Sequence, residues 1–299
     1  MEEQIYKVAI IGAGPAGIAA AIQLNKYGIK PLILEKKCIG GMLQQAFWVE
    51  NYPGFPKGIS GAKLTSIFTE QLLKNNQVTY EEVIDVKFSD NIFFIQTNQN
   101  LYKSHKLILA TGTVSKPHHY SYKIPPEAID LIKFDISDLI GMSSKRIAII
   151  GGGDLGFDFA VTLSKKNSVI LFNKNTKPGC NISLIEEYEK RKKKIRYFNN
   201  SWINKIDYDA AATELMLQTE IINRKKIFTV NYLIFAIGRW PNLDLLKNFE
   251  GKSIHYLKEA DRLAIIGDAQ GKRNRQTGIS IGDGLEAAMR FYCNSRISK

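Results

Sequence analysis

Residues 8–17, Val-Ala-Ile-Ile-Gly-Ala-Gly-Pro-Ala-Gly, decide the fold of this chain. Residues 8–11 are apolar and mostly β-branched, which predicts a short buried parallel strand. Gly12, Gly14 and Gly17 then supply a tight turn, a close backbone approach and close packing of a helix expected over residues 16–27. Because the first amides of such a helix are unsatisfied, the turn favours a pyrophosphate group as its ligand.

The residues that follow strengthen this interpretation. A second apolar strand is expected at residues 31–34, and it ends in Glu35. A carboxylate at that place reaches the hydroxyl pair of an adenosine ribose. Strand, glycine-rich turn, helix, second strand and acid in this order predict a dinucleotide site. An ordinary tight connection between a strand and a helix is the alternative.

A second copy of the motif occurs in the middle of the chain. Residues 146–150 predict a strand, residues 151–156 (Gly-Gly-Gly-Asp-Leu-Gly) repeat the glycine spacing, and a helix at 157–164 and a strand at 168–172 follow. Two such units imply two dinucleotides, or one dinucleotide and a relic site. Asn173 stands where an acid is expected, and Lys174 and Lys177 follow it. A missing carboxylate and nearby cations favour a 2′-phosphate, hence NADPH over NADH.

Length and charge set the broad class. The chain has 299 residues, of which 44% are hydrophobic, and this is enough for two domains with large cores. The net charge of +12 could steer an acidic partner, such as an acidic electron-carrier protein or nucleic acid. The positive charge is scattered, however, which favours simple surface decoration by lysine. The dense run at residues 190–194 follows a helical segment at 182–188 and is expected to be a solvated helix end without the aromatic platforms of a nucleic-acid site.

Cysteine and histidine placement argues against metal and disulfide scaffolds. The three cysteines, Cys38, Cys180 and Cys293, are far apart and form no Cys-x-x-Cys pair, as expected in a reducing cytoplasm. The adjacent His118 and His119 have no carboxylate or cysteine at ligand spacing, so a surface loop is expected there rather than a metal site. We see no leader peptide and no apolar run long enough for a membrane helix, which again favours a cytoplasmic location.

The remaining patterns place further elements. A helix is expected at residues 61–74, a strand pair at 78–88 and 91–97, and strands at 107–109, 194–198, 213–219, 225–229, 232–237 and 263–266. Asp268 follows a strand and a glycine, a place suited to holding a polyol chain; a turn aspartate or a helix N-cap is the alternative. A last helix is expected to open at residues 281–284 and to run through Phe291, so that residues 282–285 present N-terminal amides.

Taken in order, the motifs resemble one family, the low-molecular-weight thioredoxin reductases and their flavoprotein relatives. The motifs are GAGPAG at 12–17, Gly-Gly at 40–41, ENYPGFP at 50–56, ATG at 110–112, GGGD at 151–154, AIGRWPN at 236–242, and IGD, RQ and GDG between 266 and 284. The resemblance covers nearly the whole chain. It implies an α/β fold of two Rossmann-like, doubly wound, three-layer domains, with FAD held by residues 1–116 and 236–299 and NAD(P)H held by an inserted domain at 117–235. It also implies a homodimer.

The resemblance also implies roles for individual residues. Those expected to bind FAD are Gly12, Gly14, Pro15, Ala16, Gly17, Glu35, Gly41, Asn51, Thr111, Gly112, Gly267, Asp268, Arg275 and Gln276. Those expected to bind NADPH or NADH are Gly151, Gly153, Asp154, Gly156 and Lys174. The paired arginines that the family uses for a 2′-phosphate are replaced by Lys174 and Asn175, and its usual glutamine after the double glycine is Met42.

One departure from the family changes the expected chemistry. The redox-active Cys-x-x-Cys-Asp of thioredoxin reductases corresponds by spacing to Phe134, Asp135, Ile136, Ser137 and Asp138. Both sulfurs are absent, so the internal relay is lost. Asp138 then has no thiolate to protonate, and a helix cap is the simpler role. We expect Phe134 to pack on or near the flavin, and Phe134 and Asp138 are the candidates for residues beside the reacting groups.

These observations predict an NAD(P)H-dependent FAD oxidoreductase that passes electrons to an external acceptor. Ferredoxin, flavodoxin, a quinone, oxygen or a small disulfide are the candidate acceptors. Two alternatives stay open. One is a disulfide reductase that recruits Cys38, Cys180 or Cys293. The other is a non-catalytic FAD-binding module whose nicotinamide site has decayed.

Overall fold

The computed structural model describes residues 4–116, 124–249 and 251–297. Its contacts divide the chain into two compact units. Unit 1 comprises residues 1–44, 48–114 and 240–299, and unit 2 comprises residues 45–47 and 115–239. The chain therefore crosses between units at 114/115 and 239/240, a few residues from the expected 116/117 and 235/236. The placement of Gln45–Phe47 with unit 2 had no signal in the sequence.

Unit 1 is built on a sheet of order β2-β1-β5-β4-β3, with β16 also paired to β5. β1, β2, β5 and β16 are parallel, whereas β3 and β4 form the antiparallel edge. The strands are β1 (Ile5–Ile11), β2 (Leu32–Leu34), β3 (Val83–Ser89), β4 (Ile92–Thr97), β5 (Leu101–Leu109) and β16 (Leu263–Ile265).

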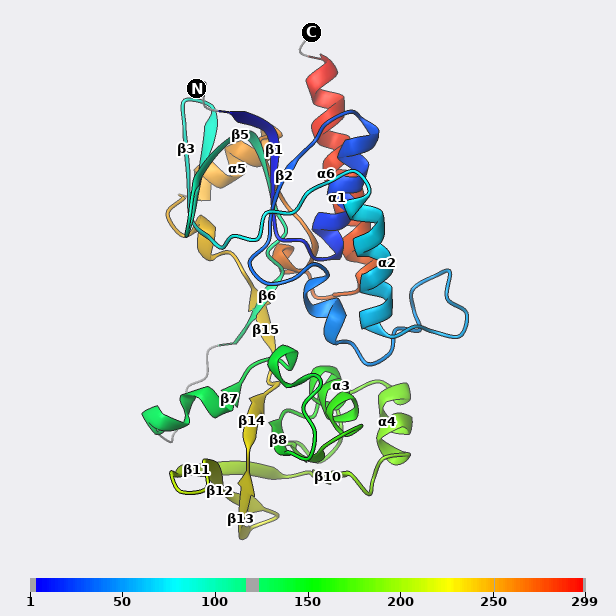
Figure 1. The fold of residues 1–299 in the computed structure, drawn as a ribbon, viewed down its shortest axis with the longest axis vertical. Helices are drawn as coiled ribbons and strands as arrows, with labels where there is room; N and C mark the ends of the chain where they lie inside the picture. Colours follow the sequence, from blue (N-terminus) through cyan, green and yellow to red (C-terminus); the bar gives the residue numbers. More distant parts are fainter. Residues whose placement is uncertain (1–3, 117–123, 250, 298–299) are drawn as a thin grey trace. The chain divides into compact units, whose positions relative to one another are not determined.

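Helices cover both faces of this sheet. In Figure 1, α1 (Pro15–Lys26), α2 (Gly61–Leu73) and α6 (Thr277–Ile297) lie side by side on one face, and α5 (Gly251–Glu259) lies beside the other. Sheet residues such as Ile11, Leu34 and Leu109 share one core cluster with Leu257 of α5. Short 3-10 turns complete the unit: η1 (Gly41–Gln45), η4 (Asp244–Leu246) and η5 (Gly267–Gln270). The result is the three-layer α/β arrangement.

Unit 2 has a five-stranded parallel sheet of order β10-β9-β8-β14-β7. Its strands are β7 (Ile132–Lys133), β8 (Arg146–Ile150), β9 (Ser168–Phe172), β10 (Ile195–Phe198) and β14 (Tyr232–Phe235). It also contains α3 (Asp154–Leu163), α4 (Ile182–Glu189), η2 (Pro126–Leu131) and η3 (Ser137–Leu139). The strands expected at 146–150 and 168–172 are confirmed with the same bounds.

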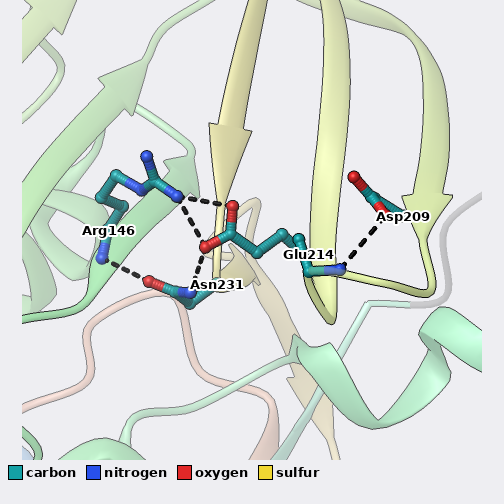
Figure 2. Close-up of polar contacts among 5 residues, drawn as sticks. Arg146, Asp209, Glu214 and Asn231 are labelled. Carbon is teal, nitrogen blue, oxygen red and sulfur yellow. Dashed lines mark hydrogen bonds and ion pairs between the residues drawn. The ribbon is translucent and has the colours of Figure 1, made fainter.

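A three-stranded antiparallel sheet covers one face of this parallel sheet. It consists of β11 (Ser201–Asp209), β12 (Glu214–Ile221) and β13 (Arg224–Val230). Its buried Leu215 and Leu217 share a core cluster with Ala148 and Phe235 of the parallel sheet. At one edge the Arg146 guanidinium donates to both Glu214 carboxylate oxygens, at 2.6 and 2.5 Å, and Asn231 bridges the two residues (Figure 2).

The segments that join the units, β6 (Thr113–Ser115) and β15 (Arg239–Pro241), pair with each other as a two-stranded sheet. The basic run at 190–194 follows the last turn of α4, as expected. His118 and His119 lie outside the described residues.

Candidate cofactor-binding sites

The first glycine-rich turn joins β1 to α1. Gly12 has φ +103°, and a Cβ there would lie 2.4 Å from the Ala110 carbonyl oxygen. A Cβ on Gly17 would lie 2.0 Å from the Gly12 carbonyl oxygen, so only glycine permits this contact between helix and turn. Gly14, by contrast, has no atom within 4 Å of its Cβ position. The helix begins at Pro15 without a side-chain cap, and its first amides therefore stay available to an anion.

Glu35 lies against this turn. Its Oε2 accepts the Ala13 N–H at 2.8 Å, and its Oε1 accepts the Lys37 N–H at 2.9 Å. A carboxylate oxygen has further lone pairs, so both oxygens can also accept ribose hydroxyls. The structure therefore places the Glu35 carboxylate directly beside the first glycine-rich turn.

Other residues expected at the first site come together from distant parts of unit 1. Gly41 lies beside Gly14, since a Cβ added to Gly41 would lie 3.7 Å from the Gly14 Cα. A Cβ on Gly267 would meet the Ala16 Cβ at 2.9 Å. The backbone-lined space at Gly14 and Gly41 is a cradle that suits a pyrophosphate, so the residues present fit a bound dinucleotide.

A second group of expected residues forms hydrogen bonds within unit 1. Asn51 Nδ2 donates to Gln276 Oε1 at 2.8 Å, across 225 positions of sequence. Thr111 Oγ1 donates to the Asn242 carbonyl at 2.6 Å, and Gly112 accepts the Asn242 N–H at 2.9 Å. Asp268 is the second residue of the η5 turn and accepts from Ser280 Oγ at 3.5 Å, while Arg275 is partly buried just before α6.

The expected helix start at residues 282–285 is wrong. Helix α6 begins at Thr277, so these residues lie inside it and present no free N-terminal amides. Gly284 instead allows α6 to approach α1, since a Cβ there would lie 2.2 Å from the Ala16 carbonyl oxygen. Asp283, for which the sequence pattern predicts no individual role, is buried and pairs with Lys272 at 2.9 Å.

The second glycine-rich turn repeats the first within unit 2. Gly151 has φ +132°, and its Cβ would lie 2.2 Å from the Ala236 carbonyl oxygen. A Cβ on Gly156 would lie 1.8 Å from the Gly151 carbonyl oxygen. A Cβ on Gly153, by contrast, would have no neighbouring atom within 4 Å. Helix α3 begins at Asp154, again without a side-chain cap. This turn therefore keeps the same cradle for a pyrophosphate.

Asn173, which follows β9, occupies the position that corresponds to Glu35 but has different surroundings. Asn173 is 2% exposed, and a Cβ on Gly152 would lie 2.3 Å from its Cγ. Its Nδ2 donates to Tyr197 Oη at 2.8 Å and to the Lys177 carbonyl at 2.9 Å. Burial raises the pKa of the Tyr197 phenol, and the hydrogen bond with Asn173 partly opposes this. Lys174 follows Asn173 on the exposed surface.

Asp154 has a local role at this turn. Its Oδ1 accepts from both the backbone N–H and the Nδ2 of Asn181, at 2.8 and 3.1 Å. Asn181 in turn caps α4 by accepting the Leu184 N–H at 3.0 Å. Asp154 therefore fixes the start of α4 relative to the second turn.

The segment that replaces the redox motif lies in unit 2. The Phe134 ring is 43% exposed and stacks on Phe235 at 5.9 Å. Asp138 lies within η3 and pairs with Lys133 at 3.5 Å. The capping role expected of Asp138 is wrong, because Asp138 lies inside η3 and this turn has no side-chain cap; Asp135 Oδ1 instead accepts the Ser137 N–H at 2.9 Å.

The cysteines show no reactive environment. Burial raises the pKa of the Cys180 thiol to about 11, which suppresses the nucleophilic thiolate at neutral pH. The Cys38 thiol donates to Gln44 Oε1 at 3.2 Å, and Cys293 is exposed on α6. None of the three forms a disulfide in the structure.

Within residues 4–116, 124–249 and 251–297, no group of three or more His, Cys, Asp or Glu side chains is arranged to hold a metal ion. In the same part of the chain, none of the helices combines the length and apolar character required to cross a bilayer.

Comparison with known proteins defines the family. The family model "Pyridine nucleotide-disulphide oxidoreductase" matches residues 6–285, and the chain belongs to this family. The chain is 30% identical to a thioredoxin reductase of Chlamydia pneumoniae, over 95% of this chain and 96% of that protein. It is 28% identical to a ferredoxin–NADP reductase of Ignicoccus hospitalis, over 82% of each.

The fold is likewise that of thioredoxin reductases. The crystal structure of T. acidophilum thioredoxin reductase superposes with a TM-score of 0.82 at 25% identity, covering 98% of this chain and 99% of that one. The resemblance and the fold class predicted from the motifs are thereby confirmed. Family membership makes the protein a thioredoxin reductase-like oxidoreductase and implies the use of a flavin and a nicotinamide nucleotide.

Proposed function

We propose that this protein is an FAD-dependent NAD(P)H oxidoreductase that delivers electrons to an external acceptor without an internal redox disulfide. The observation that carries the proposal is the replacement of both sulfurs by Phe134 and Ser137 in a chain that has no Cys-x-x-Cys pair anywhere. The two glycine-rich turns, each with its open cradle, support a flavin nucleotide at the first and a nicotinamide nucleotide at the second.

The residues of unit 1 would hold FAD. Gly14 and the amides of α1 would take the pyrophosphate, Glu35 the adenosine ribose, and Asp268 the ribityl region. Asn51, Arg275 and Gln276 would line the isoalloxazine ring. When bound, the flavin supplies the redox chemistry, accepting hydride from reduced nicotinamide and passing the electrons on. The protein contributes binding, orientation and exclusion of water.

The residues of unit 2 would hold the nicotinamide nucleotide. Gly151, Gly153 and Gly156 would form the pyrophosphate cradle, with Asp154 fixing the adjoining loop to α4. The neutral Asn173 and the neighbouring Lys174 favour NADPH over NADH, because a carboxylate would repel a 2′-phosphate.

Anaerobic mixing with NADPH and with NADH tests the proposal. We expect both coenzymes to bleach the oxidised flavin absorbance, NADPH at lower concentration. A non-catalytic module would leave the flavin oxidised with either coenzyme, and that result would overturn the proposal. A panel of ferredoxin, flavodoxin, quinone, oxygen and small disulfides then identifies the acceptor.

A variant that lacks all cysteines tests the disulfide alternative. Cys38→Ser, Cys180→Ser and Cys293→Ser combined should leave the rate of flavin reduction and the turnover with a non-thiol acceptor unchanged. The raised pKa of Cys180 supports this expectation. Loss of turnover with flavin reduction intact would instead favour a reductase that recruits these cysteines.

Phe134 is proposed to pack on or near the flavin, in place of the missing disulfide. Phe134→Ala should change the flavin absorbance bands and the turnover. An unchanged spectrum with unchanged turnover would reject this role. Phe134→Leu, which keeps an apolar side chain, is the matched control for lost packing against Phe235.

Two partners are part of the proposal. Similarity to thioredoxin reductases favours a homodimer, which sedimentation of the flavin-loaded protein will show. The second is an acidic redox protein such as ferredoxin or flavodoxin as acceptor, which a net charge of +12 could attract although that charge is scattered. If so, raising the ionic strength should slow turnover with that acceptor but leave the reaction with a neutral quinone unchanged.

A further inference from the structure

The loop after the second Rossmann strand has a fixed backbone. Residues 174–179, here called the basic loop, are all exposed. Three successive backbone carbonyls of this loop nevertheless accept hydrogen bonds from other residues of unit 2. The Asn175 carbonyl accepts the Asn200 N–H at 3.2 Å, and the Thr176 carbonyl accepts Asn199 Nδ2 at 2.9 Å. The Lys177 carbonyl accepts Asn173 Nδ2 at 2.9 Å. An exposed loop with this many backbone bonds loses little freedom when a ligand binds.

Asn173 is the centre of this arrangement. Its two amide protons go to the Lys177 carbonyl and to Tyr197 Oη, and its Oδ1 accepts the Asn175 N–H at 3.1 Å. Since a side-chain amide has only two donor protons, none is left for a ribose hydroxyl. Asn173 therefore has no proton left to donate to a ribose hydroxyl, and as a neutral amide it is no substitute for a carboxylate such as Glu35.

The same loop lies against the second glycine-rich turn and carries two cations. Gly179 N–H donates to the Gly152 carbonyl at 2.8 Å, and Gly179 forms an isolated β-bridge with Gly153. Lys174 and Lys177 are exposed, and within the described part of the chain neither ammonium group forms an ion pair or hydrogen bond. Two uncompensated positive charges are thus held on a fixed backbone beside the cradle.

We propose that Asn173 is a positioning residue that sets coenzyme selectivity, by fixing the basic loop so that Lys174 and Lys177 bind the 2′-phosphate of the coenzyme. This inference rests on the proposed nicotinamide-nucleotide site at the second turn. A phosphate dianion gains from two fixed ammonium groups, whereas a ribose hydroxyl pair gains little from them. The selectivity then comes from the loop and not from direct contact with Asn173.

Calorimetric binding of two unreactive fragments to the flavin-loaded protein tests this inference. ADP-ribose and its 2′-phosphate differ only in the group in question. We expect the 2′-phosphate to bind the wild-type protein at least about tenfold more tightly, the size of one charge-assisted hydrogen bond. Binding of neither fragment would refute the proposed site itself, whereas equal binding would refute only the inference.

A mutant cycle separates positioning from direct contact. Asn173→Ala should remove most of the preference for the 2′-phosphate and leave the affinity for ADP-ribose nearly unchanged. Lys174→Met with Lys177→Met should do the same, and adding Asn173→Ala to that pair should have no further effect. An undiminished preference in Asn173→Ala, or an equal loss of affinity for both fragments, would overturn the inference.

Two further variants guard against a folding defect. Tyr197→Phe removes a single hydroxyl that anchors Asn173 and should reduce the preference partly, without loss of flavin. Asn173→Gln offers the same amide at a longer reach, and any preference that it restores relative to Asn173→Ala supports positioning. If Tyr197→Phe and Asn173→Gln both behave as the wild type while Asn173→Ala unfolds, the loop does not depend on these bonds and the inference fails.

Discussion

The two glycine-rich turns share one backbone design, but the residue that follows the next strand is Glu35 at the first turn and Asn173 at the second. In both turns, a Cβ added to the first glycine would lie 2.4 Å or less from the carbonyl oxygen of a neighbouring segment. A Cβ added to the last glycine would collide with the carbonyl oxygen of the first. The carboxylate of Glu35 accepts two backbone amides at the first turn. At the second turn, the side-chain amide of Asn173 donates one hydrogen bond to the Lys177 carbonyl and one to the Tyr197 phenol.

This difference indicates that binding of the pyrophosphate and recognition of the ribose are separable. The glycines preserve the cradle because the close contacts of strand, turn and helix leave no room for a Cβ. In the proposed sites, the residue after the second strand differs between the two units and contributes to the choice between a free and a phosphorylated adenosine ribose.

The largest effects are expected from the glycines. Gly12→Ala and Gly151→Ala each place a Cβ against a carbonyl oxygen at positive φ, at a cost of about 3 kcal/mol or more. Gly12→Ala should abolish flavin content, whereas Gly151→Ala should keep the flavin and lose reduction by coenzyme. Flavin absorbance per protein and stopped-flow reduction measure the two outcomes.

Gly251→Ala is the matched control, since its Cβ position at the start of α5 has no neighbour within 4 Å. If Gly12→Ala kept full flavin content, the cradle at the first turn would be disproved as the flavin site.

The next largest effect is expected from Asp158, a buried carboxyl of α3. Burial raises its pKa from 3.8 to about 6, opposed by hydrogen bonds from the Phe47 N–H at 2.8 Å and from Thr162. Because the folded state holds this proton more tightly than the unfolded state, unit 2 loses stability as pH rises from about 4 through 6. The full loss is about 3 kcal/mol.

Asp158→Asn keeps an acceptor for both hydrogen bonds and removes the charge. It should raise the melting temperature at pH 8 by several degrees and change it little at pH 4. Differential scanning calorimetry at both values measures this, and an equal shift at the two pH values would contradict the assignment.

A smaller effect is expected at Glu35. Glu35→Gln turns one acceptor into a donor that faces the N–H of Ala13 or Lys37, and it removes the charge proposed to hold the adenosine ribose. The dissociation constant of FAD should rise about tenfold. Dialysis or fluorescence titration of the apoprotein gives this value. Glu70→Gln, at an exposed position of α2, should leave the dissociation constant unchanged.

The smallest effect is expected at Asp138. Its pair with Lys133 is exposed and 3.5 Å long, so Asp138→Asn should cost about 0.5 kcal/mol or less. Because no thiolate lies beside it, turnover and its pH profile should not change. A shifted pH profile would indicate that Asp138 still moves a proton in the reaction.

The sequence predicted the elements whose pattern is local. β8 and β9 have their expected bounds because each consists of one polar residue followed by four consecutive apolar residues. The strand expected from residue 78 begins only at Val83, since Thr79 instead bonds with Ile33 and Glu35 next to β2. The start of α6 was missed because its glycines resemble a turn, although Gly284 permits close packing on Ala16.

In the candidate sites, too, the features that depend on local sequence were predicted and those that depend on distant contacts were not. The cradles and the place of Glu35 follow from spacing within about twenty residues of chain. The roles of Asn173 and Asp135 depend on contacts that spacing does not reveal. Asn173 is occupied because Tyr197, 24 positions away on β10, accepts one of its protons.

A reductive titration tests the central claim most directly. The flavin-loaded protein is titrated anaerobically with dithionite, and the electrons consumed per flavin are counted from the absorbance. A protein without a redox-active disulfide is fully reduced by two electrons per flavin, which is the predicted result. Uptake of four electrons per flavin, two of them reducing a disulfide to a thiol pair, would contradict the account.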